Sequence, residues 1–255
     1  MAARHSCRTF NGLHIDKPTT DSLLAEIGTL PRLFEDVPIP AIRLVDNDRA
    51  EGRLGTYGFV AGARQFLVMA SGETVGEGLQ AGFMFEALVL KATSMGLGTC
   101  WLGGTFRRGP FAMAMGDVAD GCDVSIVSPV GHPTQKRRFA ERMMRRMVKA
   151  DQRKPFGQLF SGVSPDTPVG RVLQCVRLAP SSRNSQPWRG KVTQNVDSEG
   201  KTHITVRFDC VHDSRFSAID MGIAYCHFIL ASQKEGLCWA VERVNDSKSV
   251  IFRSR

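Results

Sequence analysis

Two stretches of the chain are apolar on nearly every side, and they resemble each other. The first spans 82–97 and the second 222–237. A helix that is apolar all round is buried in a core, so both stretches predict buried helices. Each helix is expected to end at a glycine, Gly96 or Gly236, because glycine tolerates the left-handed backbone that follows a helix C-terminus. A Cys-Trp pair then opens the next strand-like run of each segment.

A single constant offset relates the two stretches, since position 82 pairs with 222 and 96 with 236. The leucines at 90 and 230, and at 97 and 237, share this offset. One offset along a whole helix favours internal duplication. The alternative is a chance match of two buried helices, because glycine and leucine are common.

The remaining pattern mixes helices and strands, which is typical of an α+β or α/β protein. A helix capped by Thr19 or Thr20 is predicted to run through Ile27. Apolar runs and alternating patterns predict strands at 64–71, 123–129 and 203–210. The other expected features are a breaker cluster at 130–133, a basic amphipathic helix within 136–154, a linker at 161–168 and a helix at 168–178.

Composition indicates an ordinary globular protein, with 255 residues, 42% of them hydrophobic. Lysine and arginine exceed the acidic residues by 33 to 25, and a net charge of +8 suits anionic partners. Seven scattered cysteines without CxxC spacing predict reduced thiols. No signal peptide is recognisable, and no apolar run reaches the roughly 20 residues of a membrane span. We therefore expect a cytoplasmic protein without a membrane span.

The N-terminal segment 4–10 is a candidate phosphate site. It reads Arg4-His5-Ser6-Cys7-Arg8-Thr9-Phe10. Two arginines four positions apart face the same way if the segment is helical. Guanidinium groups bind phosphate oxygens in pairs, and the Ser6 hydroxyl could add a further donor. A disordered basic tail is the alternative.

Segment 179–188 is a candidate site for a heterocycle. It reads Ala-Pro-Ser-Ser-Arg-Asn-Ser-Gln-Pro-Trp, with small polar side chains between two prolines that restrict the loop. Amide side chains donate and accept, which suits the mixed edge of a heterocycle. A polar surface turn is the alternative.

Two further features have structural alternatives, and the histidines and two cysteines are interpreted structurally. The glycine-rich segment 96–106 permits close approach to a planar ligand, but packing turns would also use its glycines. Arg153, with Lys154 and Pro155, could close a phosphate site or belong to a solvated face. The histidines lack metal spacing, and His227 is interpreted as a hydrogen-bonded core residue. Cys100 and Cys238 are interpreted as core residues beside tryptophans.

Together these segments resemble the nitroreductase-like FMN family. Segment 4–10 looks like its R-x-S-x-R-x-F opening, 179–188 like A-P-S-x-x-N-x-Q-P-W, 96–103 like G-L-G-T-x-W-x-G, and 129–133 like its closing strand and turn. The resemblance implies an α+β nitroreductase-like fold. With the duplication, it implies a single-chain pseudo-dimer of two related halves, predicted at 1–160 and 161–255.

The order of the motifs departs from the usual family member, in which the A-P-S motif follows the opening motif closely. Here it lies in the second half, which lacks R-x-S-x-R, while 20–38 in the first half has neither Asn nor Gln. Each half thus keeps one part of a site. We therefore predict one complete FMN site per chain.

The resemblance also implies roles for individual residues. Arg4, Arg8 and Arg153 would neutralise the FMN phosphate, with Ser6 and His5 supporting the phosphate or ribityl chain. The isoalloxazine ring would meet the loop residues Pro180, Ser181, Ser182, Asn184 and Gln186 at its edge, and the backbone of Leu102, Gly103 and Gly104. The implied reaction is two-step hydride transfer from NAD(P)H through FMN to a nitroaromatic, quinone or similar acceptor. No catalytic side chain and no metal ligand is assigned.

Two other functions stay open. One is a flavin-binding protein of the same fold without reductase activity. The other is a nucleic-acid-binding module using 136–154, although only Phe139 and Phe156 lie near that basic run. The favoured partner is a small-molecule electron acceptor, with no nucleic acid and no membrane, for a chain expected to be a monomer.

Overall fold

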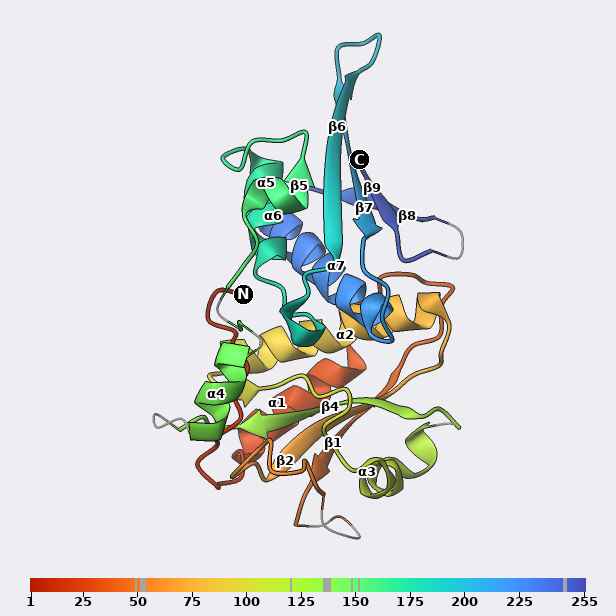
Figure 1. The fold of residues 1–255 in the computed structure, drawn as a ribbon. Helices are drawn as coiled ribbons and strands as arrows, with labels where there is room; N and C mark the ends of the chain where they lie inside the picture. Colours follow the sequence, from red (N-terminus) through yellow and green to blue (C-terminus); the bar gives the residue numbers. More distant parts are fainter. Residues whose placement is uncertain are drawn as a thin grey trace.

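The protein folds into two antiparallel-rich sheets separated by two long helices, α2 and α7 (Figure 1). This computed structural model describes residues 1–48, 50, 54–119, 121–134, 139–147, 149–150, 152–244 and 247–255. The α+β class and the arrangement as two related halves are confirmed. The first half contains α1 (Lys17–Gly28), β1 (Ala41–Asp46), β2 (Gln65–Ala70), α2 (Val75–Ser94), β3 (Gly98–Thr99), α3 (Arg108–Met115), η1 (Gly116–Ala119) and β4 (Val124–Gly131).

The chain then crosses to the second half through α4 (Phe139–Met147). There it forms α5 (Phe156–Leu159), β5 (Phe160–Ser161), α6 (Pro168–Arg177), η2 (Ser182–Asn184), β6 (Trp188–Val196), β7 (Thr202–Cys210), α7 (Ser217–Lys234), β8 (Trp239–Arg243) and β9 (Val250–Ser254). The strand orders are β1-β2-β4-β3 and β5-β6-β7-β9-β8. All pairs are antiparallel except β5 with β6. The boundary at 160/161, which falls within β5, stays a prediction.

Glycines let α2 and α7 cross in close contact. A Cβ added to Gly82 would lie 2.1 Å from the Ile219 carbonyl oxygen, and one added to Gly222 would lie 2.1 Å from the Leu79 oxygen. Leu79 and Ile219 are themselves related by the offset that relates Gly82 to Gly222, so the contact is reciprocal. Reciprocal contacts of this kind are what a two-fold axis produces, and they give the duplication a structural basis.

The predicted ends of these helices are confirmed. Gly96 and Gly236 follow them with φ of 78° and 72°, in the left-handed region. The predicted strands at 64–71, 123–129 and 203–210 correspond to β2, β4 and β7. None of the helices among the described residues is long and apolar enough to cross a bilayer.

Other local predictions need correction. Asp16, rather than Thr19 or Thr20, caps α1, because its side chain accepts from the Thr19 N–H. The basic helix is shorter than 136–154, since α4 covers Phe139–Met147; 136–138, 148 and 151 lie outside the described residues. Strand β4 continues into the expected breaker cluster as far as Gly131. Cys100 is buried as predicted, but Cys238 is exposed.

Candidate functional site

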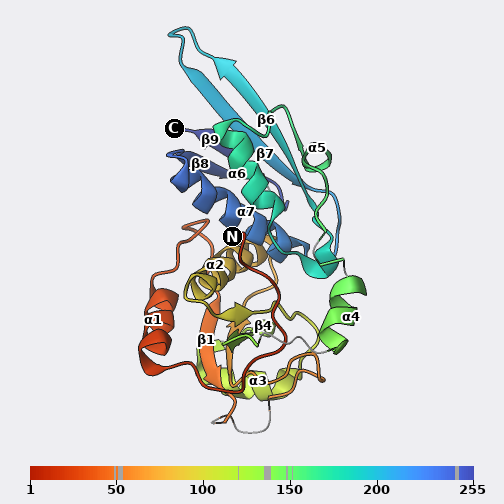
Figure 2. The same cartoon turned by 90° about the vertical axis from the view of Figure 1, so that its left-hand side faces the viewer.

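The N-terminal segment is extended rather than helical. Ser6 forms a parallel bridge with Thr99, and the Cys7 N–H donates to the Thr99 oxygen at 2.8 Å. Alternate side chains of an extended segment share a face, so Arg4, Ser6 and Arg8 face one way. The helical basis of the expectation is wrong, and it is the alternation of an extended backbone that puts the two arginines on one face. Figure 2 shows this segment passing from α7 and α2 down to the first sheet.

Cys100 marks where this face points. Burial raises the pKa of its thiol, while the charge of Arg8, a hydrogen bond with Ser6 and the charge of Arg4 oppose the shift, in that order. All three side chains of the R-x-S-x-R face therefore lie near one buried thiol of the glycine-rich segment.

The two guanidinium groups carry unused donors. Arg4 Nε, Arg8 Nε and Arg8 Nη1 are enclosed, yet they have no hydrogen-bond partner among the described residues. Leaving a buried charged donor unpaired is costly. A phosphate monoester offers several anionic acceptor oxygens to such donors. These residues therefore fit the phosphate of a nucleotide such as FMN.

Helix α4 packs against this segment through two side-chain contacts. Thr9 Oγ1 donates to Glu141 Oε2 at 2.7 Å, and Arg145 Nη1 donates to the Ser6 oxygen at 3.3 Å. Glu141 is only 5% exposed and Arg145 8%. Sequence reasoning did not select Arg145 as a site residue, although its place in the basic run was a signal. It brings a third arginine to the segment that carries Arg4 and Arg8.

The loop 179–188 is held in a constrained shape. The Ser182 N–H donates to Asp220 Oδ1 at 2.8 Å, and the Gln186 N–H donates to Ser181 Oγ at 2.9 Å. Arg183, Asn184 and Gln186 have φ of 50°, 56° and 48°, a region that non-glycine residues rarely adopt. Burial also raises the pKa of Asp220 to about 7, against the lowering effect of the Ser182 N–H.

The amide side chains of this loop bind the stretch between α4 and α5, which joins the two halves and is called the connecting segment below. Asn184 Nδ2 donates to the oxygens of Lys149 and Gln152, at 2.7 and 2.9 Å. Gln186 Oε1 accepts from the Lys154 N–H at 2.8 Å. Arg153 Nη1 donates to Asn184 Oδ1 at 3.1 Å, so this arginine lies against loop 179–188. These amides therefore fix the loop to the connecting segment.

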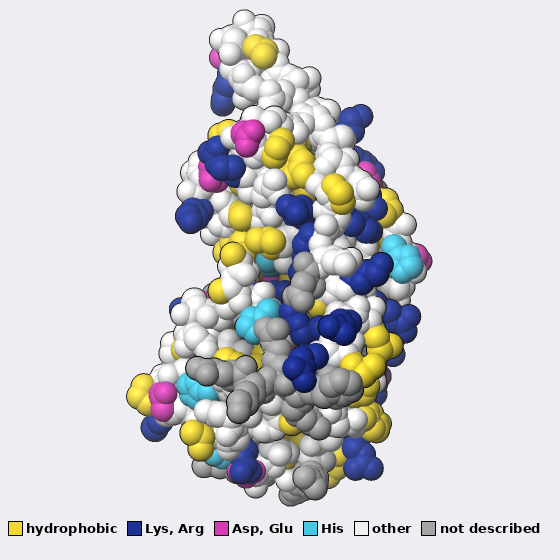
Figure 3. All heavy atoms as spheres, turned by 60° about the vertical axis from the view of Figure 1, so that its left-hand side comes forward, with side chains coloured by type: hydrophobic (Ala, Val, Ile, Leu, Met, Phe, Trp, Pro, Cys, Tyr) yellow, Lys and Arg dark blue, Asp and Glu magenta, His cyan; other side chains and the backbone are white. Residues whose placement is uncertain are grey.

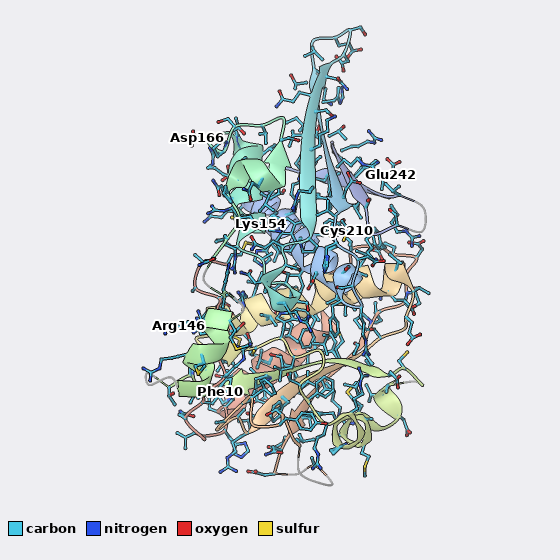
Figure 4. All side chains as sticks on the ribbon, viewed as in Figure 1. Phe10, Arg146, Lys154, Asp166, Cys210 and Glu242 are labelled. Atoms are coloured by element: carbon cyan, nitrogen blue, oxygen red, sulfur yellow. The ribbon has the colours of Figure 1, made fainter. Side chains whose placement is uncertain are left out.

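Helix α4 and the connecting segment link the N-terminal segment 4–10 to loop 179–188. Arg145 contacts Ser6, and Lys149, four positions later, contacts Asn184. The N-terminal ammonium of Met1 also lies near Cys175 of α6, where it opposes the rise in the thiol pKa caused by burial. In Figure 4, Phe10, Arg146 and Lys154 lie along the same side of the molecule. Figure 3 shows Lys and Arg side chains gathered across the middle of that side.

The glycine-rich segment 96–106, called the glycine loop below, approaches the start of α7. Leu102 exchanges two backbone hydrogen bonds with Val127, at 2.9 and 3.0 Å. A Cβ on Gly103 would lie 2.5 Å from the Phe216 ring, whereas one on Gly104 would meet nothing within 4 Å. The open space beside Gly104 is compatible with a ligand. Of the other predicted site residues, His5 is exposed and its Nδ1 lies 3.1 Å from the Ala3 oxygen, and Pro180 is half-buried.

Comparison with known proteins gives a family and a fold. A family model described as "Putative TM nitroreductase" matches residues 1–232. A structure described as a putative nitroreductase from Thermotoga maritima is 18% identical, with a TM-score of 0.66, covering 98% of this chain and 90% of that one. A nitroreductase with bound FMN from Bacteroides fragilis is 15% identical, with a TM-score of 0.41, covering 54% and 88%. No curated protein matched the sequence.

Proposed function

The chain belongs to the putative TM nitroreductase family, and we propose that it is an oxidoreductase that binds one FMN per chain. The observation that carries this proposal is the set of enclosed, unpartnered guanidinium nitrogens on Arg4 and Arg8. They lie on a segment that is linked through α4 and the connecting segment to the amide-bearing loop. FMN matches this pairing, since a phosphate lies at one end and a heterocycle at the other.

The phosphate is proposed to bind between Arg4 and Arg8, with Ser6 as a further donor. Arg145, which already contacts the Ser6 backbone, adds positive charge on this side. Arg153 is a further candidate for binding the phosphate. Its contact with Asn184 brings its charge beside loop 179–188. His5, which is exposed, is proposed only as a support of the ribityl chain.

The ring is proposed to lie between loop 179–188 and the glycine loop. Pro180, Ser181 and Ser182 would meet its edge, and the backbone of Leu102, Gly103 and Gly104 would approach its face or its N5 side. Asn184 and Gln186 are proposed to act mainly by fixing the loop, because their amides bind the connecting segment.

The contact between Gly103 and Phe216 has a counterpart across the pseudo-two-fold axis, between Arg243 and Gly76. Position 76 corresponds to 216, and a Cβ on Gly76 would meet Arg243 Nη1 at 3.3 Å. The Arg243 guanidinium lies 5.0 Å from the centre of the Phe34 ring and forms an ion pair with Asp36. This arrangement supports one site per chain, because a charged side chain with its own partners stands there in place of Gly103.

When bound, FMN would supply hydride transfer through its N5 atom. NAD(P)H is the proposed donor, and a nitroaromatic, a quinone or a similar electron-poor molecule is the proposed acceptor. The chain's own groups would bind and orient the cofactor, and solvent would protonate the product. A cytoplasmic monomer that uses no nucleic acid or membrane as partner is part of the same proposal.

The visible spectrum of freshly purified protein tests cofactor binding, because bound flavin is yellow. We expect a flavin-to-protein ratio near one after saturation with FMN, whereas a ratio near two would contradict the single site. Oxidation of NADH or NADPH in the presence of a quinone then tests the reaction. Flavin binding without this oxidation would favour the alternative function, a flavin-binding protein of the same fold without reductase activity.

A colourless protein that binds DNA or RNA in a salt-sensitive manner would instead favour the nucleic-acid module. Against that function, Glu141 and Arg145 of the basic run are buried against the N-terminal segment. Part of the run thus serves an internal contact.

A further inference from the structure

Glu86 is a carboxyl group enclosed between the two halves of the protein. It lies on α2, and its side chain is 0% exposed. Its Oε2 accepts from Trp101 Nε1 at 2.9 Å, and its Oε1 lies 2.9 Å from His227 Nε2 of α7. His227 is also 0% exposed, as expected of a hydrogen-bonded core histidine. Burying two ionisable groups is costly unless they are paired, so this contact accounts for both.

The number of protons on this pair follows from its neighbours. His227 Nδ1 lies 2.9 Å from the Cys175 carbonyl oxygen, which can only accept, so Nδ1 carries a hydrogen. The contact between Nε2 and Oε1 needs one more proton between the two atoms. With that proton on either atom, the pair as a whole is neutral. It can therefore remain in the core while Oε2 stays available to Trp101.

Trp101 connects this pair to the proposed flavin site, because Leu102, Gly103 and Gly104 follow it directly. Its indole also packs edge-on against Phe85, with ring centres 4.9 Å apart. Val127 holds the next residue through the backbone, and Phe216 lies against Gly103. The glycine loop is therefore fixed from α2, from β4 and from Phe216 at the start of α7, and Glu86 supplies the hydrogen bond from α2.

The second half provides a built-in comparison. Trp239 comes just after α7, as Trp101 comes just after α2, and its Nε1 donates to Ser232 Oγ at 2.8 Å. A neutral hydroxyl on the preceding helix is thus enough to hold a tryptophan at this place in the fold. The counterpart of Glu86 in the second half, at the offset that relates the two helices, is Cys226, which cannot reproduce the contact. Holding the tryptophan does not by itself explain a buried carboxyl bound to the opposite helix.

We propose that Glu86, fixed by His227, is a positioning residue that sets the Gly103–Gly104 backbone against the isoalloxazine ring through Trp101. This inference rests on the proposed function. Because the backbone near the ring tunes a flavin, loosening Trp101 should change the properties of the bound cofactor as well as the stability of the fold.

The test compares Trp101→Phe with its matched control, Trp239→Phe. Each variant keeps an aromatic ring and loses one indole N–H donor. The measurements are the FMN dissociation constant, the visible absorption spectrum of bound FMN and its reduction potential. We expect Trp101→Phe to weaken FMN binding about tenfold and to shift the spectrum and the potential, whereas Trp239→Phe should leave all three near the wild-type values.

A second variant, Glu86→Leu, removes the anchor without changing Trp101. We expect it to give the same spectral shift as Trp101→Phe, and the double variant to add nothing further, because the two residues act through one contact. If Glu86→Leu does not fold, the two tryptophan variants decide. Indistinguishable flavin properties of Trp101→Phe and Trp239→Phe would overturn this inference alone. Failure of the wild-type protein to bind FMN would overturn the proposed function and this inference with it.

Discussion

Gln80 of α2 and Asp220 of α7 hold corresponding loops of the two halves, although one is an amide and the other a carboxyl. Their positions are related by the same offset as Gly82 and Gly222. Gln80 Oε1 accepts from the N–H groups of Leu33 and Phe34, at 2.9 and 3.1 Å. Asp220 Oδ1 accepts from Ser182. An amide is sufficient to hold the loop in the first half, so the carboxyl in the second half carries a cost that an amide would avoid.

That cost predicts a pH-dependent stability. Burial raises the pKa of Asp220 from 3.8 to about 7, so the unfolded chain loses this proton at lower pH than the folded chain does. The contribution of Asp220 to the free energy of unfolding should therefore fall as pH rises from about 4 to about 7, by roughly 2–4 kcal/mol. Asp220→Asn keeps an oxygen acceptor and cannot ionise.

We expect Asp220→Asn to match the wild type in urea unfolding near pH 4 and to exceed it at pH 8. Equal unfolding midpoints of the two proteins at both pH values would contradict a raised pKa at Asp220.

Removing one guanidinium should weaken cofactor binding more than it harms the fold. Because Arg4 and Arg8 carry enclosed nitrogens without partners among the described residues, Arg4→Ala or Arg8→Ala should weaken FMN binding by about 1–3 kcal/mol through a lost charge-assisted bond. Fluorescence titration of the apoprotein with FMN measures this. Arg171→Ala is the control, since Arg171 is exposed and paired with Glu235, and it should leave the affinity unchanged. An unchanged affinity in Arg4→Ala and Arg8→Ala would remove both residues from the site.

The crossing of α2 and α7 should not tolerate a methyl group at either glycine. Gly82→Ala and Gly222→Ala place a Cβ about as close to a backbone oxygen in each case, 2.1 Å before relaxation. We expect both to lower the free energy of unfolding by about 1–3 kcal/mol, and by similar amounts. Gly28→Ala, where a Cβ would meet nothing within 4 Å, should change it little. A stable Gly82→Ala protein would mean that the helices separate at low cost.

Gly103→Ala should act on the cofactor through one aromatic ring. Its Cβ would press on Phe216 at 2.5 Å, so the glycine loop or the ring must move. We expect FMN binding to weaken about tenfold, which corresponds to about 1.4 kcal/mol, with a smaller effect on unfolding. The double variant Gly103→Ala, Phe216→Leu should recover part of the affinity, because the shorter side chain yields space. No recovery would show that the glycine itself is needed.

Periodicity predicted the central helices because their signal is local and long. The run around 82–96 is apolar on every side and ends at Gly96, which has a positive φ as expected. The ribbon strand β6 was not predicted, because after its first residues its side chains are exposed on both faces and no alternation remains. Helix α3 was missed because Gly109-Pro110 looks like a break, although proline is tolerated in the first turn of a helix.

Predicting the site from sequence depended on motif resemblance, and it was incomplete where distant segments meet. The R-x-S-x-R face was identified, but its backbone is extended through pairing with Thr99, which is far from it along the chain. Arg145 was not selected because its contact with Ser6 joins positions 139 residues apart. The role of Asn184 in holding the connecting segment was likewise invisible, because it depends on backbone carbonyls that carry no sequence signal.

The reciprocal crossing of α2 and α7 within one polypeptide has a consequence for dilution. In a pair of separate subunits, a site at the interface is lost when the protein concentration falls below the dissociation constant of the two subunits. Here both partners are tethered, so their effective concentration is set by the linking segment and not by the amount of protein. Loss of cofactor on dilution should therefore report the affinity of the site itself.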